Sequence, residues 1–167
     1  MFQDIQAEHK IWVEQMFPGL RPQHHGLLGS IEEWGELWEA TRRPAIEDVK
    51  DAVADITIFL INYANCHGIT LKIIEAGKPS PENIIHVAYW LTKMASAQLK
   101  MEQTAQHGAE ERYKDRDFVR EIDIALHAVM AQLAIFSRRL GFDYEATVRN
   151  TWSKVKERRR ANTTPVA

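Results

Sequence analysis

Residues 46–68, IEDVKDAVADITIFLINYANCHG, carry the pattern that decides the fold. Five apolar side chains recur there at steps of three and four residues: Val49, Val53, Ile56, Leu60 and Tyr63. Such steps place side chains on one stripe of an α-helix, so this stretch predicts a helix with one buried side. Gly68 follows at the position where a left-handed glycine commonly closes a helix.

The positions of proline divide the rest of the chain into similar stretches. Prolines stand at 18, 22, 44, 79, 81 and 165, and proline is poorly tolerated inside a helix. We therefore expect helices over residues 2–16, 27–38, 46–67, 81–106, 117–140 and 144–160, with a short segment at 70–76 and an N-cap at Asp143. Residues 107–116 are polar and predict a disordered loop. No stretch alternates apolar and polar residues, so the sequence predicts an all-α bundle of five to six helices.

Composition and charge restrict the class of protein. The chain has 167 residues, 45% hydrophobic and 26% charged, which is typical of one globular domain over 1–167. A formal charge of −2 supplies no general attraction for nucleic acid or an anionic membrane. The N-terminus lacks a signal pattern, and no apolar run approaches the roughly 18 residues of a membrane span. The single cysteine, Cys66, excludes an internal disulfide and Cys-rich zinc sites, so we expect a soluble, cytoplasmic protein.

The two halves of the sequence resemble each other. Residues 26–37 align with 83–94, and the helix end at 67–70 aligns with 140–143. The two alignments differ in offset, and the extra residues fall in the polar 107–116 stretch, where an insertion costs little. We expect an internal duplication, with 26–78 as an acidic half and 81–160 as a degenerate half. The alternative is that ordinary amphipathic helices produce the same pattern.

Acidic residues gather on the edges of two neighbouring helices. Four polar residues at steps of three, four and seven share one edge of the helix expected at 46–67: Asp48, Asp51, Asp55 and Asn62. The preceding helix carries a second acidic edge, made of three glutamates: Glu32, Glu33 and Glu36. The short connection 41–45 makes the two helices antiparallel neighbours, so both edges are expected to meet.

Carboxylates this dense favour a bound cation. Near a protein surface each close pair repels by about 1 kcal/mol or more unless a cation neutralises the charge. Oxygen ligands without His or Cys select Mg²⁺ or Mn²⁺ over zinc. The alternative is a solvated acidic face. Against that alternative, the apolar run 56–61 follows Asp55 directly, which indicates that the acidic edge approaches the interior.

These acidic residues resemble the motifs of a known family. EEWGE at 32–36, followed by DAVAD at 51–55 and a helix that ends at HGI, 67–69, is similar to the MazG-like branch of the all-α nucleoside triphosphate pyrophosphohydrolases. The family pattern is E-E-x-x-E followed, after a variable gap, by E-x-x-D. The resemblance extends over residues 5–67 and returns at 150–155. The two motifs together are more specific than either one alone.

The resemblance implies roles for individual residues. The expected Mg²⁺ ligands are Glu33, Glu36 and Asp55. Glu32 or Glu36 is the expected catalytic carboxylate that orients or deprotonates the attacking water, and Glu32 is also a candidate for a further metal. Where the family has the Glu of E-x-x-D, this sequence has Ala52, which cannot bind a metal. Asp51, one residue earlier, is the expected replacement ligand, with Asp48 as a second candidate.

The implied reaction is hydrolysis of a nucleoside triphosphate to the monophosphate and pyrophosphate with Mg²⁺, or Mn²⁺ in its place. Four residues are candidates for substrate binding: Asn62, Trp90, Lys93 and Lys154. Asn62 shares the acidic edge, Trp90 and Lys93 align with Glu33 and Glu36 in the degenerate half, and Lys154 lies on the basic last helix. For each, the alternative is a core or solvated side chain.

Two further expectations concern partners and class. We expect a homo-oligomer, a dimer or a tetramer, formed through the remaining apolar faces, because closed symmetric assemblies are common. The alternative to an enzyme is a non-catalytic helical module that binds a nucleotide or a protein, its chemistry weakened by Ala52.

Overall fold

The computed structural model describes residues 2–19, 22–72, 83–108 and 110–163. Within these ranges the helices are α1 (Gln3–Met16), α2 (His25–Ala40), α3 (Ile46–Cys66), α4 (Asn83–His107), α5 (Glu110–Tyr113), α6 (Phe118–Arg139) and α7 (Tyr144–Thr163). The described residues form no strand, and α5 is a single turn of four residues. The prediction of an all-α bundle is therefore confirmed.

Predicted and observed helices agree closely, with two exceptions. Residues 70–72, where a short helix was expected, are not helical, and 73–76 lie outside the described residues. The loop expected at 107–116 contains α5. That turn is attached to α6, because the Tyr113 ring lies edge-on to Phe118, with centroids 5.8 Å apart, and Arg116 Nε donates to Glu121 Oε1 at 2.8 Å. These contacts join the expected loop to the start of α6. The polar composition of residues 107–116, on which the prediction of a disordered loop was based, does not reveal them.

The ends of the helices follow the signals in the sequence. Gly68 has φ +66°, and the next amide, of Ile69, donates to the carbonyl of Ala64 at 2.9 Å, which closes α3 as predicted. At the start of α7, the carboxylate of Asp143 accepts from the amide of Ala146 at 2.9 Å. This is the predicted N-cap, and it satisfies one of the free amides of the first turn.

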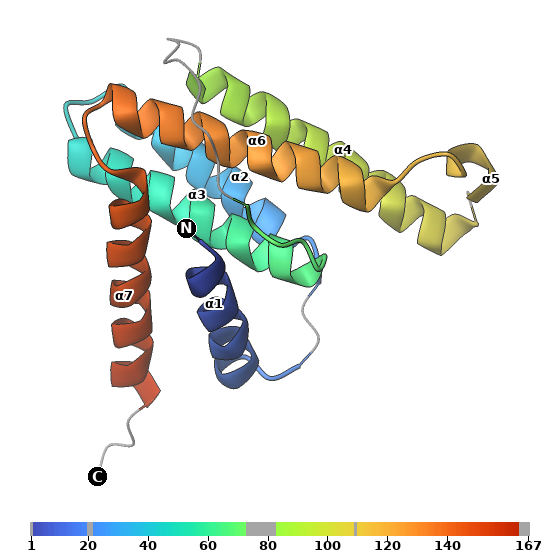
Figure 1. Cartoon of the computed structure of the whole chain (residues 1–167), viewed down its shortest axis with the longest axis horizontal. Helices are drawn as coiled ribbons and strands as arrows, with labels where there is room; N and C mark the ends of the chain where they lie inside the picture. The colour runs from blue at the N-terminus through green and yellow to red at the C-terminus, as the bar shows by residue number, and fades with distance from the viewer. Residues whose placement is uncertain (1, 20–21, 73–82, 109, 164–167) are drawn as a thin grey trace.

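Two helix pairs enclose the core. Figure 1 shows α2 and α3 as one antiparallel pair, against which α4 and α6 form a second pair. The largest fully buried side chains come from both pairs and include Ile56, Leu60, Met94 and Leu126. Each half of the chain thus supplies one helical hairpin, a form that suits a duplicated sequence, although the duplication itself stays a prediction. No helix among the described residues is long and apolar enough to cross a membrane.

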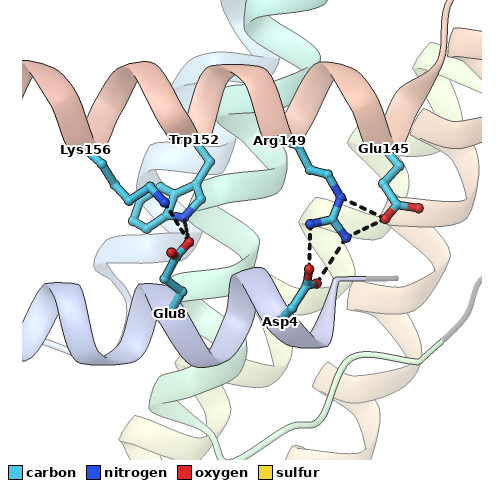
Figure 2. Close-up of polar contacts among 6 residues, drawn as sticks. All are labelled: Asp4, Glu8, Glu145, Arg149, Trp152 and Lys156. Carbon is cyan, nitrogen blue, oxygen red and sulfur yellow. Dashed lines mark hydrogen bonds and ion pairs between the residues drawn. The ribbon is translucent and has the colours of Figure 1, made fainter.

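Helices α1 and α7, from opposite ends of the chain, lie side by side (Figure 1) and are held by two groups of polar contacts (Figure 2). Arg149 donates to both oxygens of Asp4, at 2.5 and 3.1 Å. One turn further along, Glu8 Oε2 accepts from Trp152 Nε1 at 2.6 Å and lies 2.8 Å from Lys156 Nζ. We call these contacts of Asp4 and Glu8 with α7 the clasp. The clasp ties both terminal helices to the same side of α3, away from the acidic edges.

Candidate metal centre

Carboxylates from α2 and α3 line one open cleft of about 370 Å³. Its walls come from three places along the chain. Helix α2 contributes Glu36, Glu39 and Ala40, and the connection 41–45 contributes Arg43. Helix α3 contributes Asp48, Asp51, Ala52 and Asp55. The antiparallel packing expected from the short connection is therefore observed, and it places carboxylates from both helices around a shared space.

Glycine brings the two helices together. A Cβ atom at position 26 would lie 2.7 Å from the carbonyl oxygen of Phe59, and one at position 29 would lie 2.5 Å from the ring of Phe59. Glu33 follows Gly26 by seven residues and Gly29 by four, so it lies on the same side of α2. The close approach of the backbones therefore presses Glu33 against α3, where it becomes half-buried.

Glu33 has the most unusual electrostatic environment in the cleft region. Its pKa is raised from 4.5 to about 7, first because burial disfavours the charged form and then because Asp55, Glu36 and Glu32 surround it with negative charge. Carboxylates of both helices therefore raise the pKa of the same group, the Glu33 carboxyl. A divalent cation placed among them would offset this repulsion.

The raised pKa of Glu33 predicts a pH dependence of stability. A folded-state pKa above the unfolded value contributes stability below about pH 4.5 that is lost as the pH rises through about 7. In metal-free buffer, Glu33→Gln is therefore expected to melt close to wild type near pH 5 and at a higher temperature near pH 8, as measured by circular dichroism. Glu14→Gln, at an exposed site on α1, controls for the loss of one carboxylate. An equal difference at both pH values would contradict the prediction.

The cleft is not a preformed metal cage. Across the described ranges, no three His, Cys, Asp or Glu side chains are gathered closely enough to hold an ion. Repulsion between like charges favours rotamers that separate carboxylates when no cation lies between them. Arg43 brings a positive charge to the lining, and its guanidinium lies 3.4 Å from the Glu39 carboxylate. The donors that face the cleft are carboxylate oxygens, which suit Mg²⁺ and exclude a zinc site of the His or Cys type.

The predicted metal ligands are brought together to different degrees. Glu36, Asp51 and Asp55 line the cleft itself, and so does the reserve residue Asp48. Glu33 does not line it, but the charges of Asp55, Glu36 and the exposed Glu32 act on Glu33. Ala52, where the family motif has a ligand, is 4% exposed and forms part of the lining without a donor atom. Asp51, one residue earlier, is exposed at the cleft.

The four predicted substrate-binding residues lie elsewhere. None of Asn62, Trp90, Lys93 and Lys154 lines the acidic cleft. Asn62 is half-buried beyond the cleft on α3, and Lys154 is exposed on α7. Trp90 packs against the core, as its alternative interpretation stated, and Lys93 Nζ lies 5.4 Å from the centroid of the Tyr89 ring on α4. Their contact with a substrate stays a prediction.

Two lining residues were missed by sequence reasoning. Glu39 follows Glu36 by three residues and so continues the same acidic edge, a signal that was available. Arg43 lies in the connection 41–45, and nothing in the local pattern shows that its side chain turns toward the carboxylates.

No family model, curated protein or solved structure matches the chain. The MazG-like resemblance therefore rests on the two acidic motifs, of which Glu36, Asp51 and Asp55 line one cleft.

Proposed function

We propose that this protein is a Mg²⁺-dependent nucleoside triphosphate pyrophosphohydrolase, which converts a nucleoside triphosphate and water to the monophosphate and pyrophosphate. The observation that carries the proposal is the cleft between α2 and α3, in which Glu36 from one helix and Asp51 and Asp55 from the other line a shared space beside the half-buried Glu33. An acidic cluster of this kind between two helices is the arrangement expected of a site that binds divalent cations and, through them, phosphates.

The residues divide into two roles under this proposal. Glu33, Glu36 and Asp55 would hold Mg²⁺, with Asp51 supplying the carboxylate that Ala52 lacks. When bound, Mg²⁺ offsets the negative charge of phosphate oxygens and lowers the pKa of a bound water. Glu32, which is exposed and next to Glu33 in the chain, would orient the attacking water and accept its proton. Arg43, which also lines the cleft, would supply a positive charge toward the phosphates.

A specific observation favours a second candidate function. The part of the chain that the structure describes holds no preformed cluster of three ligands, and Ala52 replaces a family ligand on the cleft lining. Both features would be expected of a non-catalytic helical module that keeps the scaffold and binds a nucleotide or a partner protein.

One assay tests the proposal. The purified protein is incubated with each common ribo- and deoxyribonucleoside triphosphate plus Mg²⁺, and pyrophosphate is measured. We expect release with at least one nucleotide and none in the presence of EDTA. If the panel is silent, a rise in melting temperature with Mg²⁺ and a non-hydrolysable triphosphate would support the binding module. A silent panel with no thermal shift would exclude both nucleotide functions.

A further inference from the structure

A second cavity, the apolar pocket, lies at the end of the bundle where α2 is joined to α3 and α6 is joined to α7 (Figure 1). Its volume is about 560 Å³, larger than that of the acidic cleft. Val49 of α3, Ile84 of α4 and Phe136 of α6 contribute to its walls. The lining also includes Ile46 and Leu140, whose side chains are 44% and 41% exposed. Cavities of this size with mostly apolar walls commonly bind small molecules.

The charge of the apolar pocket is positive. Among the described residues that line it, Arg43 and Arg139 carry charge and none is acidic. The remaining polar residue of the lining, Thr41, donates its hydroxyl proton to the Trp38 carbonyl at 2.8 Å. A guanidinium group offers hydrogen-bond donors and no acceptor. Apolar walls beside two guanidinium groups are complementary to an anion that carries an apolar body.

Arg43 is held only loosely in its present position. Its guanidinium lies 3.4 Å from the Glu39 carboxylate, and the two side chains are 62% and 72% exposed. Exposed ion pairs of this kind contribute little to stability, so an anion in the apolar pocket can displace Glu39 as the partner of Arg43. Arg43 also lines the acidic cleft, so the two cavities share this side chain.

We propose that the apolar pocket binds a small monocarboxylate with an apolar chain. The carboxylate would accept hydrogen bonds from Arg43 and Arg139, because its planar shape matches the fork of a guanidinium group. The chain would lie against Val49, Ile84 and Phe136 and leave water. Binding should therefore depend both on the negative charge and on the length of the chain. Each further methylene group should tighten it about two- to fourfold.

Occupation of the apolar pocket has a consequence for the acidic cleft, which rests on the proposed function. Under that function Arg43 supplies a positive charge to the phosphates of the substrate. A carboxylate that engages Arg43 from the apolar pocket withdraws this charge from the cleft. Octanoate should therefore raise the KM for the nucleoside triphosphate and change kcat much less. Binding of octanoate itself needs neither Mg²⁺ nor a nucleotide and is tested without them.

Isothermal titration calorimetry of the full chain in metal-free buffer tests the site. Octanoate is the probe, hexanoate and butyrate are its shorter analogues, and octylammonium is the matched cation. We expect saturable one-to-one binding of octanoate that weakens at least about fourfold for hexanoate and again for butyrate. Octylammonium should bind at least about tenfold more weakly than octanoate, because it meets two guanidinium groups.

Two variants and their matched controls locate the site. Arg139→Gln removes one guanidinium, and Leu140→Glu places a carboxylate beside both, so each should weaken octanoate binding about tenfold or more. Arg138→Gln is the control for the first, since Arg138 is exposed next to Arg139 and does not line the pocket. Ile124→Glu is the control for the second, because Ile124 on α6 is 53% exposed away from the pocket. Both controls should stay within about twofold of wild type.

Three results would overturn the proposed site. They are no saturable binding of octanoate, binding of octylammonium as tight as that of octanoate, and binding that Leu140→Glu leaves unchanged. Leu140→Glu keeps the test valid even if Arg139→Gln fails to fold. Octanoate binding with an unchanged KM would refute the shared use of Arg43. A chain that binds octanoate but releases no pyrophosphate with any nucleotide refutes the proposed function and leaves the carboxylate site standing.

Discussion

Asp55→Asn is expected to lower Mg²⁺-dependent pyrophosphate release at least about a hundredfold, because a ligated cation contributes several kcal/mol of transition-state stabilisation. Glu36→Gln should have a similar effect from the opposite wall of the cleft. Both substitutions keep the shape of the side chain, remove its charge and replace one acceptor oxygen by an NH2 donor. They also remove negative charge from around Glu33, so neither should destabilise the fold. The measurement is initial rate with the best nucleotide of the panel, beside a circular dichroism spectrum.

Glu47→Gln is the matched control for this pair of variants. Glu47 lies on α3, as Asp55 does, but it is exposed outside the cleft and paired with Lys50 at 2.7 Å. Its substitution should leave the rate within about twofold of wild type, as is usual for an isolated surface ion pair. Wild-type turnover in both Asp55→Asn and Glu36→Gln would remove these residues from the mechanism.

The second large effect is expected at Gly26. In Gly26→Ala the new Cβ would lie 2.7 Å from the Phe59 carbonyl oxygen and 2.8 Å from the Tyr63 amide nitrogen. Both are backbone atoms of α3 and cannot turn aside, so α2 must move away from α3. Overpacking of this kind typically costs about 1–3 kcal/mol or more. Urea unfolding should show this loss, and the displacement of Glu33 from α3 should weaken Mg²⁺ binding as well.

Gly35 offers the matched control on the same helix. A Cβ at Gly35 meets nothing within 4 Å, so Gly35→Ala should change stability only through helix propensity, which favours alanine by about 0.5–1 kcal/mol. If Gly26→Ala unfolds with the same urea midpoint as wild type, the two backbones do not approach each other this closely.

The pairing of the acidic motifs could be predicted because each step depends on local pattern. Asp51 and Asp55 are four residues apart and therefore lie on a common edge of any helix. The connection 41–45 is so short that α2 and α3 must pack antiparallel. Glu36, Asp51 and Asp55 accordingly line one cleft, as the motifs indicated. Helix ends such as Gly68 were equally readable, since they depend on backbone conformation at one residue.

Other properties of the site could not be predicted, because they depend on packing between segments. Trp90 and Lys93 align with Glu33 and Glu36 in the second half, but the pair α4 and α6 packs so that neither residue lines the cleft. The burial that raises the pKa of Glu33 depends on how closely Gly26 and Gly29 let α2 approach Phe59. The spacing of residues along the sequence does not predict the distance between the backbones of α2 and α3.

By itself the sequence determined the helices, their ends and the acidic edge that each of two helices carries, since these follow from periodicity and backbone preference within a few turns. The tertiary structure alone decided which face of each helix meets another, and with it the burial of Glu33, the apolar pocket beside Arg43 and Arg139, and the clasp between Asp4 and Arg149. Such features depend on side-chain volumes and charges meeting across long separations in the chain, where no local pattern constrains them.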